Sequence, residues 1–166
     1  MEKKIKKQKI ESVLVLHNIR SVLNVGAMFR TADAIGVSRI ILSGYSPTPI
    51  DRFGRMRSDF SKASLGSEKT MIWEYVITIS PTLKKLKQEG FEIIGVEQDA
   101  RSVDYKEITL NPNNKVAIVM GTETTGIDSE ILKQCDIITE IPMKGMKESL
   151  NVSVAAGIIL YRLLDQ

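Results

Sequence analysis

Short, nearly continuous apolar runs recur along this chain, separated by stretches with helical spacing. The runs are residues 12–16, 39–42, 91–96, 116–120 and 137–141. A strand that is apolar at almost every position, instead of every second one, is typical of a sheet buried on both faces. Alternating strands and helices therefore predict an α/β fold with a mainly parallel sheet flanked by helices.

Two of the intervening helices carry start and stop signals. In the first, Asn24 is the expected N-cap and Gly36 the residue that ends the helix in the left-handed conformation. In another, Ser80 is the expected N-cap, Pro81 takes the first helical position and Gly90 ends the helix. Both helices fall between predicted strands, in agreement with the alternation.

Length and composition limit the class of protein. The chain has 166 residues, of which 43% are hydrophobic and 26% charged, typical of one globular domain, which we place at residues 11–166 after a tail of residues 1–10. The longest apolar run, residues 154–161, is far shorter than the roughly 20 residues of a membrane-spanning helix. A single cysteine, Cys135, and a single histidine, His17, exclude a disulfide framework and argue against a Cys/His zinc site. We expect a cytoplasmic protein without a metal.

Positive charge is concentrated in two segments. The net charge is +3, but the first ten residues carry +4, so the rest of the chain carries −1. The tail lysines are Lys3, Lys4, Lys6, Lys7 and Lys9. The second segment holds Arg52, Arg55, Arg57 and Lys62, interleaved with Phe53 and Phe60. Both suit the phosphates and bases of RNA, the tail also suits anionic lipid, and a solvated segment without a partner remains the alternative for each.

The last predicted helix, residues 151–164, is apolar on nearly every face. A helix of this kind must be covered all round, and in so short a chain a second copy can supply the cover. We therefore expect a homodimer formed through this helix. The alternative is a central helix wrapped within one monomer.

Three segments that follow predicted strands are candidates for the functional site, because open parallel sheets bind ligands beyond the carboxyl ends of their strands. The segments are HNIRSVLNVGAMFRTADAIGV, GTETTGI and IPMKGMKESLNVSVAAG. We expect all three at the same edge of the sheet.

Several common chemistries do not fit these segments. Gly121 and Gly126 have the glycine spacing of a phosphate-binding loop, but Ile127 and Asp128 stand where its lysine and hydroxyl residues belong. A dinucleotide-binding G-x-G-x-x-G is absent from the sequence. A hydrolase triad would need His17, and no G-x-S-x-G elbow positions a serine. We expect His17 to be a packing residue at a strand end.

Taken together, the three segments resemble the motifs of the SpoU branch of the SPOUT RNA methyltransferases. The matching motifs are N-x-G-x-x-x-R-T at residues 24–31, G-x-E-x-x-G at 121–126, I-P-M at 141–143 and S-L-N-V-S at 149–153. The resemblance covers residues 11–166 and implies a C-terminal deep trefoil knot, an exception among folds. It also implies S-adenosyl-L-methionine as cofactor, bound mainly by backbone, with Gly121, Ile141 and Leu150 touching it, and it agrees with a homodimer.

The resemblance also implies roles for polar residues of these motifs. Arg30 would contact the RNA phosphate beside the target ribose and assist loss of the 2′-hydroxyl proton. Because a guanidinium group is a poor base, stabilising the alkoxide is more convincing than abstracting the proton. Asn24 would position the substrate, although a helix cap alone is an alternative. Glu123 would anchor Arg30 or a backbone amide. Ser149 and Asn151 would hydrogen-bond at the active site, with capping again the alternative.

The expected activity is S-adenosylmethionine-dependent methylation of a ribose 2′-hydroxyl in RNA. The alternative is a catalytically idle, knotted RNA-binding module. Many relatives carry an RNA-binding domain ahead of the catalytic one, and we expect a minimal version here that favours tRNA over rRNA. Thr124 and Thr125 replace the bulkier charged residues that often follow the motif glutamate, which affects the RNA-facing side of the site.

Overall fold

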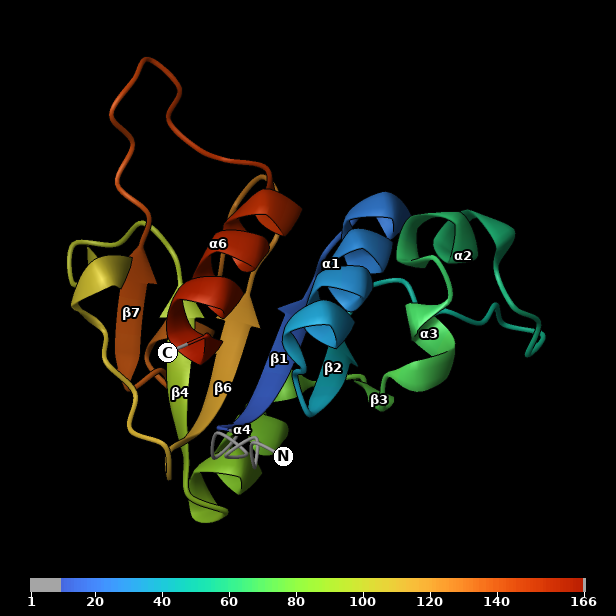
Figure 1. Ribbon diagram of the computed structural model, residues 1–166, viewed down its shortest axis with the longest axis horizontal. Coiled ribbons are helices and arrows are strands. Elements are labelled where there is room, and N and C mark those ends of the chain that lie inside the picture. The colour runs from blue at the N-terminus through green and yellow to red at the C-terminus, as the bar shows by residue number, and fades with distance from the viewer. Residues whose placement is uncertain (1–9, 166) are drawn as a thin grey trace, which may run out of the picture.

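The computed structural model describes residues 10–165, which contain one seven-stranded sheet in which every strand pair is parallel. In spatial order the strands are β3 (Trp73–Val76), β2 (Arg39–Ser43), β1 (Glu11–His17), β6 (Lys115–Met120), β4 (Phe91–Val96), β7 (Ile137–Glu140) and β5 (Val103–Asp104). Their carboxyl ends point to the same edge of the sheet (Figure 1). The predicted α/β fold with a parallel sheet is confirmed.

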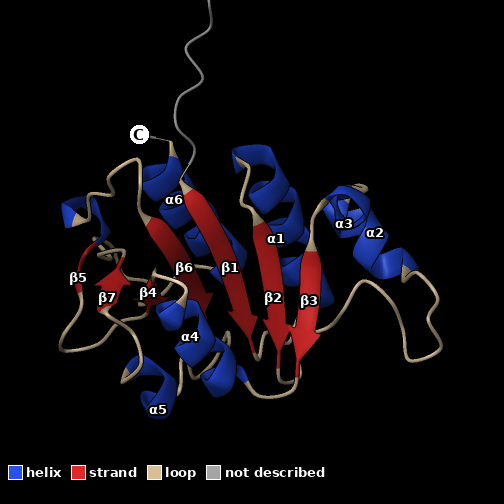
Figure 2. Cartoon of the chain, turned by 90° about the horizontal axis from the view of Figure 1, so that it is seen from below, coloured by secondary structure: helices blue, strands red, loops and turns tan. Residues whose placement is uncertain are grey.

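Helices cover both faces of the sheet. On one face, α1 (Val22–Ile35) and α6 (Val152–Leu164) pack side by side, and on the other lie α4 (Ile79–Gln88) and α5 (Ser129–Leu132) (Figure 2). The short helices α2 (Ser58–Ser64) and α3 (Ser67–Thr70) pack beside α1, and a 3₁₀ turn spans Tyr105–Glu107. Alternate residues of the central strands enter two separate cores, because successive side chains of a strand point to opposite faces. This explains why the strands are continuously apolar.

The five predicted strands are present as β1, β2, β4, β6 and β7, whereas β3 and β5 were not predicted from the sequence. Both missed strands form the outer edges of the sheet. β3 is partly exposed along its length and includes Glu74 and Tyr75, and β5 has two residues. Edge strands of this kind carry little apolar signal, because one side of each has no neighbouring strand.

Two predicted helix caps were wrong. Ser21, three residues before Asn24, caps α1 by accepting a hydrogen bond from the Asn24 backbone N–H at 3.2 Å, while the predicted end at Gly36 has the left-handed φ of 80°. α4 begins one residue before Ser80, so that Ser80 and Pro81 lie within its first turn. Asn24 is thus inside α1, where its side chain is free to bind another element.

Residues 10–165 leave one face of α6 uncovered. Its buried residues are Ala156, Ile159, Leu160 and Leu163. On the opposite side, Val154 and Tyr161 are 50% and 46% exposed, so residues 10–165 do not wrap this helix on every side. Within residues 10–165, no helix combines the length and the apolarity needed to cross a membrane.

Candidate active site

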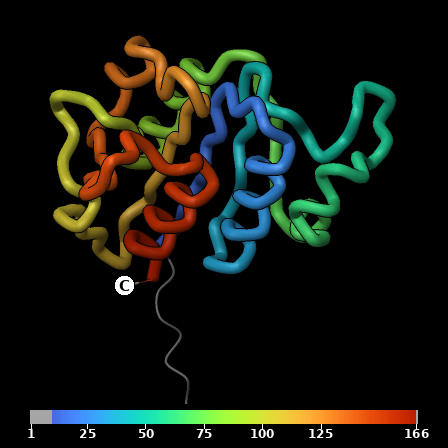
Figure 3. Tube along the Cα trace, turned by 90° about the horizontal axis from the view of Figure 1, so that it is seen from above, coloured from blue at the N-terminus to red at the C-terminus, as the bar shows by residue number. Residues whose placement is uncertain are grey.

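A cavity of about 290 Å³ lies at the carboxyl edge of the sheet, between the segments after β4, β6 and β7 and the start of α6. The lining includes Gly121, Ile141 and Leu150, the three residues predicted to touch a cofactor, together with Glu123 and Ser149. Figure 3 shows the segment after β7 passing over this region before it enters α6. Two of the three predicted motifs therefore line one cavity.

The cavity is acidic. Three carboxylates line it, those of Glu97, Glu123 and Glu140, and no lysine or arginine is among its lining residues. A binding site for phosphate groups needs positive charge or a cluster of inward-pointing backbone N–H groups. The charge of this cavity instead favours a small molecule that carries positive charge.

Two glycines allow the backbone to fold tightly against this cavity. A Cβ atom at Gly121 would lie 2.5 Å from the carbonyl group of Gly126, and Gly126 itself has a φ of +70°. A Cβ atom at Gly126 would also lie 1.8 Å from Glu97 Oε2, which accepts a hydrogen bond from the Ile127 backbone N–H at 2.7 Å. Sequence analysis missed Glu97, although it is the first residue after β4 at the same edge of the sheet as the motifs.

Glu123 joins the segments after β1 and β6. Its carboxylate accepts hydrogen bonds from the backbone N–H groups of Arg20 (2.9 Å) and Ser21 (3.0 Å) and from the side-chain amide of Asn24 (3.1 Å). Partial burial raises the pKa of Glu123, but these three donors outweigh it, so that the pKa is lower than its ordinary value. Of the two anchoring roles predicted for Glu123, the structure contains the one with backbone amides.

Asn151 extends this network to α6. Its side-chain N–H donates to Asn24 Oδ1 at 3.2 Å, while its own Oδ1 accepts from the Ser153 backbone N–H at 2.9 Å. Asn151 is therefore both the N-cap of α6 and a link to the first motif. The chain Glu123, Asn24, Asn151 brings all three motifs together beside the cavity.

Arg30 does not join this group within one chain. It is exposed on α1, six residues or about 9 Å of helix rise beyond Asn24, and makes no hydrogen bond or ion pair with any residue in 10–165. It shares one face of α1 with Leu23, Ala27 and Ala34, at helical spacing. Arg30 thus lies in a mainly apolar helix surface next to α6.

His17 packs at the end of β1, as predicted. Its Nδ1 lies 2.8 Å from the hydroxyl of Ser43, and its Nε2 lies 3.5 Å from a carboxylate oxygen of Asp128. Burial lowers the pKa of His17 and outweighs the opposing effect of Asp128. Ser43 is fully buried, so this Ser, His and Asp arrangement offers no accessible nucleophile.

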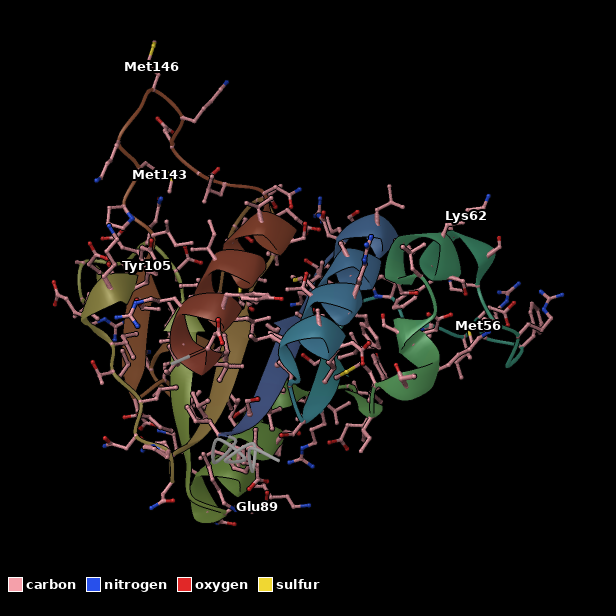
Figure 4. The ribbon with its side chains drawn as sticks, in the orientation of Figure 1. Met56, Lys62, Glu89, Tyr105, Met143 and Met146 are labelled. Carbon is pink, nitrogen blue, oxygen red and sulfur yellow. The ribbon has the colours of Figure 1, made fainter. Side chains whose placement is uncertain are left out.

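The basic segment after β2 is less cationic than its sequence indicates. Arg55 and Arg57 form ion pairs with Asp51 and Asp59, each at 2.9 Å, whereas the guanidinium of Arg52 lies over the ring of Phe53. Figure 4 shows Met56 and Lys62 of this region at the opposite end of the molecule from Tyr105.

The position of Phe60 differs from the one expected for a residue of an RNA-binding segment. It is fully buried and packs edge-on against Phe29, with ring centroids 5.1 Å apart, so it cannot stack on a base. It belongs to α2, whose amphipathic spacing places it in the core. The predicted RNA contacts at Lys3, Lys4, Lys6 and Lys7 lie outside the described residues.

Comparisons with known proteins identify a family that matches most of the chain. Residues 11–161 match the model of the SpoU rRNA methylase family. The chain is 36% identical over 148 residues to the 23S rRNA (guanosine-2′-O-)-methyltransferase RlmB of Neisseria meningitidis, an alignment that covers 89% of this chain and 56% of that protein. The chain spans about three fifths of the length of the curated relatives that it matches.

Solved structures give the same result. An AdoMet-bound rRNA methyltransferase from Sinorhizobium meliloti superposes with a TM-score of 0.82 at 29% identity, covering 95% of this chain and 57% of that one. The TrmH/SpoU tRNA modifying enzyme of A. aeolicus gives 0.79 at 30% identity, covering 94% and 75%. The family model matches residues 11–161 of this chain, and the chain shares its fold with these enzymes. The chain therefore belongs to the SpoU rRNA methylase family.

Proposed function

We propose that this protein transfers a methyl group from S-adenosylmethionine to a ribose 2′-hydroxyl of RNA. The observation that carries the proposal is the acidic cavity, bordered by the hydrogen-bonded chain of Glu123, Asn24 and Asn151. The guanosine-2′-O specificity in the name of the Neisseria relative supports the choice of the ribose hydroxyl.

The cavity fits S-adenosylmethionine in the charge and polarity of its lining. The molecule carries a positive sulfonium, and the cavity wall offers carboxylates without basic side chains. Gly121 and Gly126 let backbone groups form the wall, while Ile141 and Leu150 supply apolar surface for an adenine ring. When bound, S-adenosylmethionine would supply an electrophilic methyl group at this edge of the sheet.

The residues around the cavity would position the ribose. Asn24 and Asn151 hold each other's amides in place, so little ordering remains to be done when the ribose binds. Ser149, which lines the cavity, would donate a hydroxyl to the same substrate. Arg30 would stabilise the negative charge that develops on the 2′-oxygen as its proton leaves for solvent.

A second copy of the chain would bring Arg30 into the site. Leu23, Val154 and Tyr161 are exposed apolar residues on the surface of α1 and α6, and Arg30 lies on the same surface. We therefore propose a homodimer through this surface, with Arg30 in the interface and acting on RNA bound across it.

Mixing inactive Arg30→Ala and Glu123→Ala chains should restore part of the activity. One of the two sites in a mixed dimer would be intact, because it would take Glu123 from one chain and Arg30 from the other. No recovery would contradict this arrangement.

The proposal also includes a single domain and a knot. Residues 11–166 would form one methyltransferase domain, and the segment leading into α6 would form the deep trefoil knot of the SPOUT fold. The knot proposal is supported by the way residues after β4, β6 and β7 surround the start of α6. Limited proteolysis that released a stable fragment from within residues 11–166 would contradict the single domain, and a crystallographic chain trace tests the knot.

One incorporation experiment tests the activity. The protein is incubated with methyl-labelled S-adenosylmethionine and either tRNA or rRNA, and the digested nucleosides are separated. We expect label in 2′-O-methylnucleosides, with tRNA still the predicted substrate of the two. Label in bases would overturn the ribose assignment, and binding of RNA without incorporation into any RNA would favour the idle module.

A further inference from the structure

A second cavity, of about 760 Å³, lies between the segment that follows β2 and the edge strand β3. Aromatic side chains dominate its lining: Tyr45, Phe53 and Tyr75 are 55%, 65% and 44% exposed, and Trp73 contributes a partly exposed ring. Such a concentration of solvent-facing rings in one hollow is unusual, because exposed aromatic surface costs free energy unless a partner covers it. We call this hollow the aromatic cleft.

The walls of the aromatic cleft are held in place before any ligand arrives. The Tyr75 hydroxyl donates to the Gly44 carbonyl at 2.6 Å, and the Thr48 hydroxyl donates to the Ile50 carbonyl at 2.6 Å. At the rim, the guanidinium groups of Arg52 and Arg55 lie 4.7 and 5.0 Å from the centre of the Phe53 ring. Planar groups fixed in this way present stacking surfaces at a low entropic cost.

One short loop separates the aromatic cleft from the proposed active site. Ser46, in the cleft wall, accepts a hydrogen bond from the Ile19 backbone N–H at 2.9 Å and donates to the Leu16 carbonyl at 2.8 Å. The next two backbone N–H groups, of Arg20 and Ser21, bind Glu123 of the active-site cavity. Of three consecutive residues, the first is thus tied to the aromatic cleft and the next two to the active-site cavity, so this loop lies between the two cavities.

The loop carries an available cation between the two cavities. The Arg20 side chain is exposed and makes no ion pair within residues 10–165. Arg52 likewise has no carboxylate partner in the described part of the chain, whereas Arg55 and Arg57 are neutralised by Asp51 and Asp59. The positive charge that remains therefore lies between the cavities and at the rim of the cleft.

We propose that the aromatic cleft binds an unpaired nucleotide of the RNA substrate, next to the nucleotide that is methylated. Its base stacks on the rings of Tyr45 and Tyr75, and Arg20 binds the phosphate that joins it to the target nucleotide. Only β1 lies between β2, which leads into the cleft, and β6, which leads into the active-site cavity, so the facing sides of the two cavities are about two strand spacings, or roughly 10 Å, apart. This inference rests on the proposed function for the position of the target nucleotide, and it makes the substrate segment single-stranded.

The fluorescence of Trp73 can be used to measure binding of RNA in the aromatic cleft. It is the only tryptophan of the chain and lines the aromatic cleft, so all tryptophan fluorescence comes from a ring in the wall of this cavity. The protein is titrated with a single-stranded hexauridylate and, separately, with a short double-stranded RNA of equal charge. We expect quenching of Trp73 by the single strand and little change with the duplex, because paired bases cannot stack on a protein ring.

Variants connect the signal to named residues. Tyr45→Ala should weaken hexauridylate binding about tenfold, within the range for loss of one base stack, while Tyr45→Phe should keep it. Arg20→Gln should lower the slope of log affinity against log salt by about 0.7, the value for one phosphate contact on a single strand. Ile72→Ala, which removes a 69% exposed apolar side chain next to Trp73 in the sequence, is the matched control and should leave hexauridylate binding unchanged.

The outcomes separate this inference from the proposed function. Equal quenching by the duplex, or unchanged affinity of Tyr45→Ala, would overturn the nucleotide site and leave the cleft to another partner, such as a protein segment. Binding of S-adenosylmethionine, followed by calorimetry, should be the same in Tyr45→Ala and the parent protein. If methyl transfer is absent but single-stranded RNA still quenches Trp73 through Tyr45, the cleft stands and the proposed activity fails.

Discussion

At the scale of single residues, the site depends on one carboxylate more than on any other group. Glu123 accepts two backbone hydrogen bonds from Arg20 and Ser21 and a third from Asn24, three donors from the segment after β1. Ionised Glu123 therefore stabilises the loop before α1. Arg30, in contrast, has no such partner within residues 10–165, and we propose that it acts on substrate from a second copy of the chain.

Glu123→Gln tests the structural part of this role through pH. Because the folded-state pKa of Glu123 is lowered, its ionisation stabilises the fold above the ordinary value of 4.5, and this contribution is lost as pH falls through the folded-state pKa. At pH 7 we expect the Tm of the variant to be lower by at most about 2–4 °C, since the group is exposed and its charge is screened. The two melting temperatures should converge below pH 4.5.

The control for this measurement is Glu148→Gln, which changes an exposed carboxylate without a side-chain hydrogen bond in the described residues. Its Tm should match that of the parent protein at every pH. A Tm difference between Glu123→Gln and the parent that persisted unchanged at pH 3 would contradict the electrostatic explanation.

Arg30→Ala should abolish turnover while leaving cofactor affinity nearly unchanged. The cavity that would bind S-adenosylmethionine has no contribution from Arg30, whereas loss of one group that stabilises an oxyanion typically costs about 10² to 10³ in kcat. Single-turnover methylation measures the first quantity and calorimetry the second. A parallel loss of both would assign Arg30 to the fold or the cofactor site, and Arg30→Lys should recover part of the rate.

At the scale of elements, the turn after β6 shows how the backbone shapes the cavity. Thr122 and Gly126 pair with each other across the turn, and Glu97 holds the next N–H from the end of β4. The turn is thus held from two neighbouring strands. Its shape requires glycine because Gly126 has a positive φ and no room for a side chain.

Gly126→Ala should weaken S-adenosylmethionine binding strongly. A methyl group there would collide with the Glu97 carboxylate in a backbone conformation that alanine avoids, so the turn must open. We expect at least a tenfold rise in the dissociation constant by calorimetry, with the far-UV spectrum retained. Gly145→Ala is the matched control, because no atom lies within 4 Å of its Cβ position. Unchanged binding by the Gly126 variant would remove this turn from the cofactor site.

The exposed face of α6 gives a direct test of the homodimer. Val154→Glu places a charge on the uncovered side and should shift the protein to a monomer in analytical ultracentrifugation without loss of folding. Ile72→Glu, at an exposed site away from α1 and α6, should remain dimeric. A monomeric parent protein, or a dimeric Val154→Glu, would refute the interface. Ile159→Glu cannot serve here, because Ile159 is fully buried and the charge would disrupt the core.

At the scale of the whole molecule, the proposed binding features lie along a single edge of the sheet. The acidic cavity, the chain of Glu123 with the two asparagines and the aromatic cleft follow the strand order from β7 to β3. Most of the excess positive charge lies instead in residues 1–10. Affinity for RNA phosphates and selection of the target nucleotide are thus expected from different parts of the chain.

Deleting residues 2–9 should separate these two contributions. Each lysine that binds a phosphate adds roughly 0.7–0.9 to the slope of log affinity against log salt, so the deletion should weaken RNA binding at low salt and flatten its salt dependence. S-adenosylmethionine affinity and the oligomeric state should be unaffected. An unchanged salt slope would leave the tail as a solvated segment and assign RNA binding to the folded surface.

The amino-acid sequence by itself determined the parallel α/β sheet, its five central strands and the three motifs, because continuous apolar runs and residues directly after strand ends are local properties of the chain. It could not show that Ser21 caps α1 and frees Asn24 for Glu123, that Glu97 supports the turn at Gly126, or that Phe60 is buried while Tyr45 and Tyr75 are exposed. These outcomes depend on contacts between residues up to 127 positions apart. Only the packing of strands and helices decides which side chains meet, because local spacing specifies the face of an element and not the neighbour that covers it.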